Sequence, residues 1–247
     1  MKIAVLSDIH SNVFALEAVI EDAKRHGVEQ MVNLGDIFYG PIAPKATYDL
    51  LSKHKFITIQ GNQDRQIYEA SPEEVDANPT MQFILDDLGE EPRSWMKSLP
   101  FDNQLSNEVY MCHGTPRNDE EYLLEDIETG FPHLRSDSDI SSLLNGVSSE
   151  IILCGHTHIP RTVKLASGQL IINPGSVGLP AYTDDEPVIH SMENYCPHAS
   201  YAVLERVESG WTVQQIKVYY DYRKAAEKAK ERGRKDWEHF LSTGRGF

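Results

Sequence analysis

The first twelve residues place an apolar segment directly before polar side chains that can bind metal. Lys2 to Leu6 is a short, partly β-branched run, and Ser7-Asp8-Ile9-His10 follows at once. This pattern is typical of a strand buried on both faces whose carboxyl end opens into a site. On an extended backbone the Cα atoms of Asp8 and His10 would lie roughly 7 Å apart, so both side chains could bind one cation. Taken alone, such a triplet more often marks a strand that ends in an Asp-capped turn.

The same pattern recurs four times. Apolar segments precede Gly35-Asp36, Gly61-Asn62-Gln63-Asp64, His113-Gly114 and Gly155-His156-Thr157-His158. Ligands of parallel-rich sheets bind beyond the carboxyl ends of the strands, so these segments predict one shared site. Its O and N donors suit two divalent cations with a bridging ligand, an arrangement that supports in-line displacement at phosphorus. The predicted metal ligands are Asp8, His10, Asp36, Asn62, His113, His156 and His158.

Each predicted ligand also has an ordinary interpretation. A single histidine near a strand end more often makes a hydrogen bond than binds metal, and Gly-Asp and Gly-Asn are common turn dipeptides. The pair His156 and His158 is harder to explain in this way, because two adjacent imidazoles repel each other when protonated. The absence of a thiolate favours Mn, Fe, Ni, Co or Zn over Cu(I). We expect the other histidines on the surface: His26, His54, His133, His190, His198 and His239.

The periodicity of the chain predicts a single α/β (α+β) domain over residues 1–247. A strand, a helix and a strand within the first 35 residues indicate a right-handed parallel βαβ unit, and hairpins follow at 162–172 and 200–218. This order indicates a mixed sheet first and a second sheet packed on it, with helices outside both. We expect helical or loop inserts near 65–100 and 117–145, and a C-terminal helix over 221–241.

Charge and composition narrow the choice of partners. Lys plus Arg number 23 and Asp plus Glu number 38, a net charge of −15, so no general attraction to nucleic acid or anionic membranes is expected. No apolar run approaches the ~18 residues of a membrane span. Three cysteines and the lack of a signal-peptide pattern indicate a reducing cytoplasm. Basic residues between 222 and 241 predict a solvated, non-catalytic helix face, or else a contact for a phosphorylated or nucleic-acid partner.

The five motifs, in this order, resemble the calcineurin-like metallophosphoesterase superfamily over residues 2 to about 180. The segment Asn173-Pro174-Gly175-Ser176 makes the chain most similar to the small bacterial and archaeal phosphodiesterases of this superfamily. From the residues alone, the segment fits either a plain turn or a backbone nest near the phosphate. The resemblance implies a four-layer αββα sandwich of two mixed β-sheets flanked by helices. It also implies two divalent transition-metal ions, with Mn favoured. One would bind Asp8, His10 and His158, the other Asn62, His113 and His156, and Asp36 would bridge both.

The resemblance further implies hydrolysis of a small phosphate ester, more often a diester, by a metal-bridging hydroxide. Asp36 and Asn62 would be catalytic, and Asn12 resembles a position near the phosphate. Gln63 departs from the family, which mostly has a histidine there that is thought to assist the leaving group. An amide cannot release a proton at neutral pH, and general acid catalysis is worth ~10²–10⁴-fold. We therefore expect Gln63 to be a catalytic residue as well as a substrate contact, and to favour leaving groups that need little protonation.

Two other functions also fit the sequence. One is a nucleotide or dinucleoside polyphosphate hydrolase. The other is a metal-binding scaffold with little catalysis, whose real target is a partner protein. Gln63 keeps the scaffold hypothesis open, whereas the intact set of seven metal-competent side chains counts against it.

Overall fold

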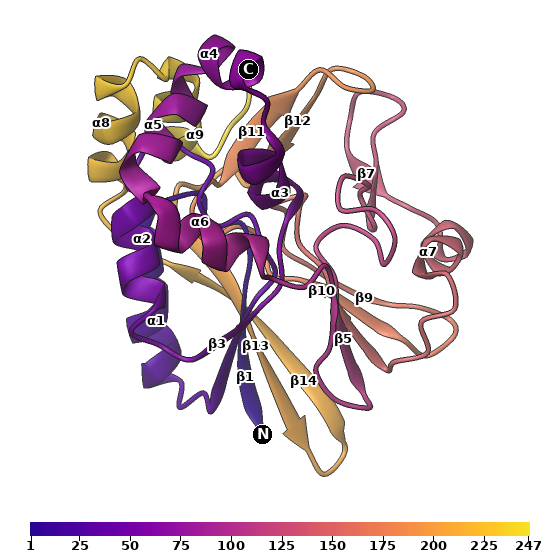
Figure 1. Ribbon diagram of the computed structural model, residues 1–247. Helices are drawn as coiled ribbons and strands as arrows, with labels where there is room; N and C mark the ends of the chain where they lie inside the picture. Colours follow the sequence, from indigo (N-terminus) through magenta and orange to yellow (C-terminus); the bar gives the residue numbers. More distant parts are fainter.

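Two five-stranded sheets lie face to face at the centre of the computed structural model, which describes residues 1–247 (Figure 1). The first sheet has the order β14-β13-β1-β2-β3. Its parallel strands are β1 (Lys2–Leu6), β2 (Gln30–Asn33) and β3 (Phe56–Thr58). The antiparallel hairpin of β13 (Ala199–Val207) and β14 (Gly210–Val218) pairs with the free side of β1, so the end of the chain returns to the sheet in which it began.

The second sheet has the order β4-β5-β8-β10-β9. The parallel strands β5 (Val109–Met111), β8 (Ile151–Leu153) and β10 (Leu170–Asn173) form its centre. The antiparallel strands β4 (Asn103–Gln104) and β9 (Arg161–Lys164) form its edges. Both sheets are therefore mixed, as predicted.

Helices cover the outer face of each sheet. Those against the first sheet include α1 (Val13–Arg25), α2 (Pro44–Leu51), α8 (Tyr222–Glu231) and α9 (Lys235–Thr243). The insert between β3 and β4 is helical, with α3 (Asn62–Glu69), α4 (Pro72–Ala77), α5 (Pro79–Leu88) and α6 (Glu90–Lys97). Helix α7 (Asp137–Leu144) packs on the second sheet (Figure 1). These layers confirm the αββα sandwich.

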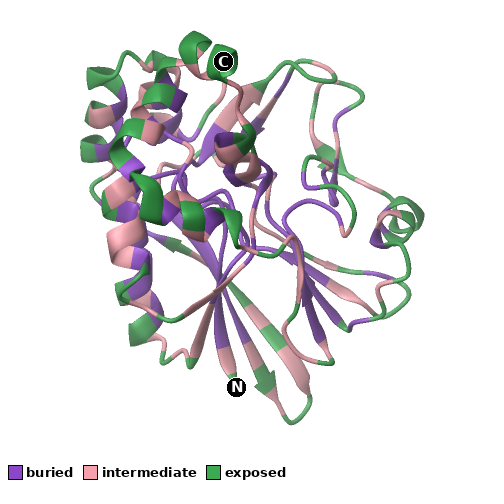
Figure 2. Cartoon of the chain, in the orientation of Figure 1, coloured by how far each residue is buried: buried purple, intermediate pink, exposed green.

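Strand β1 is buried on both faces, as its apolar sequence indicated. Ala4 and Leu6 pack against the helices, whereas Ile3 and Val5 pack between the two sheets. Figure 2 shows the buried residues concentrated in the strands and in the loops at their upper ends. Each sheet can therefore support polar loops at that edge without losing its apolar core.

Three features differ from the sequence-based expectations. The C-terminal segment forms two helices, because residues 232–234 interrupt it and Gly233 has a positive φ of 75°. His190 is buried rather than exposed, since it lies in an unpredicted hairpin of β11 (Ala181–Asp184) and β12 (His190–Glu193). A second short hairpin joins β6 (Glu125–Asp126) to β7 (His133–Leu134).

No helix has the length and apolar character needed to cross a bilayer.

Candidate metal centre

The loops that follow the parallel strands are bound to one another by backbone hydrogen bonds. The Asp8 N–H donates to the Gly35 carbonyl (3.0 Å), and the His10 N–H donates to that of Asp36 (3.0 Å). Across the two sheets, the His156 N–H donates to Asp8 Oδ2 (3.2 Å). These bonds bring the strand ends of both sheets into a single site.

Much of this site has strained backbone. Eight non-glycine residues of the chain have positive φ, and five of them are predicted metal ligands: Asp8, His10, Asp36, His156 and His158. Such conformations are costly for residues with a Cβ, and they cluster at functional sites where the surrounding structure enforces them. Their concentration here indicates that the loops are shaped for side-chain placement rather than for chain reversal alone.

Two glycines of the motifs are needed because the loops approach closely. Gly35 has φ of 101°, and a Cβ at this position would collide with the backbone of Gly61. A Cβ at Gly61 would in turn collide with the Asp36 carboxylate. The Gly-Asp and Gly-Asn pairs are therefore packing requirements of the site, beyond their common use in turns.

Six predicted ligands form two groups of side chains, each with its donor atoms within 4.8 Å of one another. In the first group, which also includes Asp8, the Nε2 atoms of His10 and His158 lie 3.0 Å apart. In the second group, which also includes His156, His113 Nε2 lies 3.5 Å from Asp36 Oδ2. The seventh predicted ligand, Asn62, places Oδ1 3.0 Å from His113 Nε2. The same Asp36 oxygen lies 4.0 Å from His10 Nε2, so Asp36 stands between the groups.

Backbone carbonyls orient the imidazoles. The Nδ1 atoms of His10, His113 and His158 face the carbonyls of Tyr39 (3.0 Å), Leu34 (2.8 Å) and Leu179 (2.7 Å), respectively. Each Nδ1 must donate to its carbonyl, which leaves the Nε2 lone pair directed into the site. His156 is reversed, because its Nε2 donates to the Glu120 carbonyl (3.1 Å) and leaves Nδ1 free.

The charges of the site are strongly coupled. Burial and then the His158 charge lower the pKa of His10 to about 4, and burial and then His113 lower that of His156 to about 4. Burial also disfavours the cationic form of His113, but the Asp36 carboxylate outweighs it and raises that pKa to about 10. His10 and His156 are therefore held in the neutral, metal-binding form, whereas His113 keeps a proton on Nε2 that a bound cation would replace.

The residues present fit a pair of divalent cations. Asp8 Oδ1 is buried and makes no hydrogen bond, although a buried carboxylate oxygen normally makes one, and His158 Nε2 lies 3.4 Å from it. The two Nε2 lone pairs of His10 and His158 face each other at 3.0 Å, which is repulsive between neutral rings. A cation between these atoms would satisfy the oxygen and both nitrogens at once.

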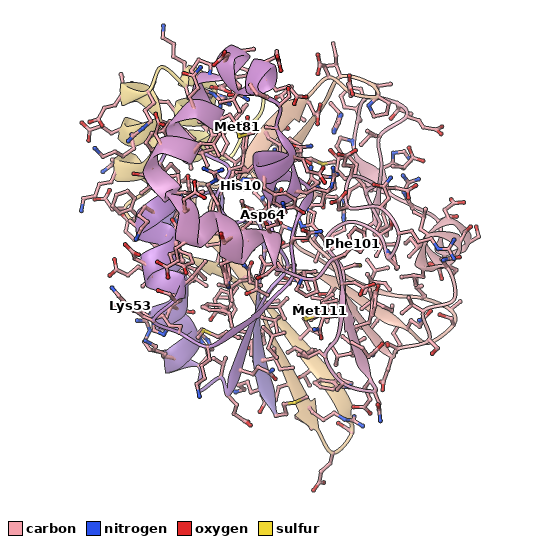
Figure 3. All side chains as sticks on the ribbon, viewed as in Figure 1. His10, Lys53, Asp64, Met81, Phe101 and Met111 are labelled. Carbon is pink, nitrogen blue, oxygen red and sulfur yellow. The ribbon has the colours of Figure 1, made fainter.

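Gln63 and Asp64 follow Asn62 in the first turn of α3. The Gln63 N–H donates to Asp36 Oδ1 (2.9 Å), and its side-chain Oε1 is buried without a partner. Asp64 is fully buried and accepts from the N–H groups of Ile37 (2.9 Å) and Gly61 (3.0 Å), so it binds two of the metal-centre loops together. Figure 3 shows Asp64 near His10 where the helical insert meets the sheets. Burial and then the Asp36 charge raise the pKa of Asp64 to about 7.

Asn12, predicted to lie near the phosphate, makes its hydrogen bonds within the fold. Its side chain is buried, caps α1 by accepting from the Ala15 N–H (3.1 Å), and donates to the Gly178 carbonyl (2.9 Å) and the Tyr220 hydroxyl (3.0 Å). Both N–H groups of the amide are used within the fold, and the phosphate contact of Asn12 stays a prediction.

The segment Asn173-Pro174-Gly175-Ser176 is a structural turn rather than a phosphate nest. Ser176 Oγ donates to the Asp8 carbonyl (2.8 Å), and the Gly175 N–H donates to Asn173 Oδ1 (2.9 Å). The next two N–H groups, of Val177 and Gly178, donate to the carbonyls of Ser7 and Asp8 (both 2.9 Å). The turn thereby fastens the second sheet to the end of β1.

A pocket of about 410 Å³ opens over the donor groups. Its lining includes His10, Asp36, Asn62, Gln63 and His158. The C-terminal segment also lines it, which corrects the expectation of a merely solvated helix face. Sequence reasoning missed most of the other lining residues, because the aromatic residues look like ordinary core and the polar residues like ordinary surface: Tyr39, Tyr122, Leu179, Tyr182, Thr183, Asp184, Arg234, Asp236, Trp237, Phe240 and Phe247.

Fold and site together define a metallophosphoesterase, and comparison with known proteins identifies the family. The model of the calcineurin-like phosphoesterase superfamily domain matches residues 1–194, so this chain belongs to that superfamily. Its fold is shared by a metallophosphoesterase from Sphaerobacter thermophilus, with a TM-score of 0.77 over 99% of this chain and 100% of the other, at 24% identity.

Two curated relatives extend the comparison. The uncharacterized protein MJ0912 of Methanocaldococcus jannaschii is 27% identical over 95% of this chain and 94% of its own length. The phosphodiesterase YfcE of Escherichia coli K12 is 25% identical over 73% of this chain and 81% of its own length. The similarity therefore includes a protein named for phosphodiester hydrolysis.

Proposed function

We propose that this protein is a metal-dependent phosphoesterase that hydrolyses phosphodiesters at a dinuclear site. The observation that carries the proposal is the convergence of two groups of metal-competent side chains, with the facing nitrogens of His10 and His158 and the unpartnered oxygen of Asp8. The phosphodiesterase name of the Escherichia coli relative supports the same reaction class.

In this proposal the chain supplies the ligands of two transition-metal ions, with Mn favoured among Mn, Fe, Ni, Co and Zn. Asp36 would bridge the ions, since Oδ2 stands between His10 and His113 while Oδ1 is fixed by the Gln63 N–H. When bound, the two cations would activate water for in-line attack on phosphorus and neutralise the phosphoryl oxygens. One ion would bind Asp8, His10 and His158. The other would bind His113 and His156 together with Asn62, whose Oδ1 lies 3.0 Å from His113 Nε2.

Two features favour a diester over a monoester. Arg234 is the only lysine or arginine that lines the pocket, and it is paired with Asp236, so a phosphate dianion would find little positive charge beyond the metals. The Gln63 amide lines the pocket and cannot release a proton to the leaving group, which favours leaving groups that depart as stable anions. The same scarcity of cationic side chains disfavours a polyphosphate substrate, and the complete donor set disfavours a non-catalytic scaffold.

Hydrolysis of bis(p-nitrophenyl) phosphate with added Mn²⁺ tests the proposal. We expect turnover that a chelator abolishes and that His113→Ala reduces by about 10²-fold or more, since loss of a ligand disrupts charge stabilisation at phosphorus. His133→Ala is the matched control, because His133 is exposed and lies outside both donor groups. Turnover that persists after the chelator is added would contradict the proposal. Equal turnover by the His113→Ala and His133→Ala variants would also contradict it.

A further inference from the structure

The outer wall of the pocket is built by the C-terminal segment Arg234–Phe247, which lies beyond the residues matched by the family model. Trp237 packs against the metal centre, with its ring centroid 5.8 Å from that of His10 in an edge-to-face arrangement. On its other side, the guanidinium carbon of Arg234 lies 5.3 Å from the indole. The segment therefore reaches from the donor groups to the pocket rim.

Arg234 is held in place with hydrogen-bonding capacity to spare. Nη2 donates to Asp236 Oδ2 (2.6 Å), Nε donates to the same carboxylate (2.9 Å), and Nη1 donates to Thr80 Oγ1 (2.8 Å). A guanidinium has five N–H groups, so two remain free. The side chains of Arg234 and Asp236 are 27% and 38% exposed, respectively, so this neutral pair presents both donors and acceptors to the pocket.

Helix α5 supports two sides of the pocket. Thr80 accepts from Arg234, and the neighbouring Asn78 donates to the Tyr39 hydroxyl (3.2 Å). On the opposite side, the Tyr182 hydroxyl donates to that of Tyr122 (2.9 Å). These bonds fix the rings of Tyr39, Tyr122 and Tyr182 before any ligand arrives. Six aromatic side chains line the pocket: Tyr39, Tyr122, Tyr182, Trp237, Phe240 and Phe247.

We propose that the segment Arg234–Phe247 binds the ester group that stays on phosphorus and selects a planar aromatic group with hydrogen-bonding edges, as a nucleobase has. This inference rests on the proposed phosphodiesterase function. Fixed aromatic walls favour a flat π-system, and the Arg234–Asp236 pair offers partners to ring nitrogens and carbonyls. An alkyl group would use neither feature, and the volume of about 410 Å³ is within the range of small-molecule sites.

The test uses three diesters with the same p-nitrophenolate leaving group, so that leaving-group effects cancel. The retained group is methyl, phenyl or thymidine-5′-yl. With Mn²⁺ we expect kcat/KM to rise in that order, with the thymidine ester roughly 10-fold or more above the methyl ester, mainly through KM. Calorimetric binding of thymidine 5′-(methyl phosphate) and of dimethyl phosphate to metal-free protein should show the same preference without turnover.

Variants assign the preference to the segment. Arg234→Gln and Phe247→Ala should each lower the thymidine-to-methyl ratio of kcat/KM by about 3-fold or more. Phe247 is 79% exposed, so its truncation does not threaten the core. Lys235→Gln is the control, because Lys235 is exposed and does not line the pocket, and the ratio should not change.

The two proposals fail in different ways. Similar kcat/KM values for all three diesters in the wild-type protein, or an unchanged ratio in both pocket variants, would overturn this inference and leave the phosphodiesterase function intact. Absence of turnover of all three diesters with Mn²⁺ would overturn both.

Discussion

Asp36 is the side chain on which both donor groups depend. Its Oδ2 faces His10 and His113, and its Oδ1 accepts from the Gln63 N–H. Burial alone would raise the pKa of this carboxyl, but the charge and hydrogen bond of His113 together with the His10 charge outweigh burial and lower the pKa below its ordinary value, so Asp36 is anionic at neutral pH. An anionic bridge is what two cations a few ångströms apart require.

Asp36→Asn should therefore reduce metal content and activity together. An amide keeps an oxygen for the Gln63 N–H but cannot supply the bridging charge, so we expect activity to fall by about 10²-fold or more. Elemental analysis of the purified variant measures occupancy, and circular dichroism checks that it folds. Full metal occupancy in a folded Asp36→Asn protein would eliminate the bridging role.

Gln63→His tests the leaving-group expectation. The histidine would be a weak general acid here, because Asp64 is fully buried, is directed to the N–H groups of Ile37 and Gly61 and does not line the pocket where it would orient the new ring. We expect the rate to fall steeply with leaving-group pKa in the wild-type protein. The variant should gain less than ~10-fold for a poor leaving group, well below the range of a well-placed acid.

A series of aryl and alkyl phosphodiesters at fixed metal concentration measures this dependence for both proteins. A rate increase of 10²-fold or more for poor leaving groups in Gln63→His would contradict this expectation, because it would show that a histidine at position 63 is an effective acid without orientation by Asp64. Gln63→Ala is the matched control, because it removes the amide without supplying an imidazole and should bring no gain for poor leaving groups.

Individual residues were predictable where the backbone pattern alone fixed them. All seven predicted ligands follow strand ends, and parallel strands of adjacent sheets must bring such residues together. Asn12 follows the same strand, yet it caps α1, because the sequence does not reveal which polar groups the fold consumes. His190 was misplaced because its burial comes from Tyr122, 68 positions away, whose hydroxyl lies 3.0 Å from His190 Nε2.

At the scale of elements, the C-terminal helices are part of the core. Helix α8 buries Ala225, Ala226 and Ala229, and α9 buries Trp237 and Phe240, all against the side chains of the first sheet's helical layer. The sequence did not indicate that these helices are buried. Their basic residues alternate with apolar residues at helical spacing, and the apolar face of α8 is made mainly of alanine. A truncation after Tyr220 would therefore test folding rather than catalysis.

Phe240→Ala should lower the free energy of unfolding by about 3–5 kcal/mol, the usual cost of removing a buried aromatic ring. Phe240 is 4% exposed, whereas Phe247 in the same segment is 79% exposed. Phe247→Ala should change the free energy of unfolding by less than ~0.5 kcal/mol. Urea denaturation of both variants makes the comparison, and equal losses would contradict the assignment of α9 to the core.

The sequence did not predict the short hairpin of β11 and β12. The hairpin β11–β12 has strands of four residues rich in polar side chains, and its loop contains Asp185, Glu186 and Pro187. No alternation of apolar and polar residues distinguishes it from a loop. It nevertheless supplies Tyr182, whose ring lies 4.7 Å from that of His158 in an edge-to-face contact. The pocket wall was therefore not predictable, although the convergence of the metal-competent side chains was.

At the scale of the molecule, the two sheets together place the carboxyl ends of their parallel strands at one site. Strand β1 contributes Asp8 and His10 from the first sheet, and β8 leads to His156 and His158 from the second. The core between the sheets fixes their distance, since Ile3 and Val5 pack against the side that carries Val109 and Ile151. The order of motifs predicted this architecture, whereas the return of β13 and β14 to the first sheet depends on long-range pairing.

The central claim is that two cations, held by these two groups of side chains, are needed for phosphodiester hydrolysis. Its most direct test is one titration of metal-free protein with Mn²⁺, in which bound metal and the rate of bis(p-nitrophenyl) phosphate hydrolysis are both measured. We predict that the rate rises until two equivalents are bound and then stays constant. Maximal activity with no metal bound, or with one equivalent, would contradict the account.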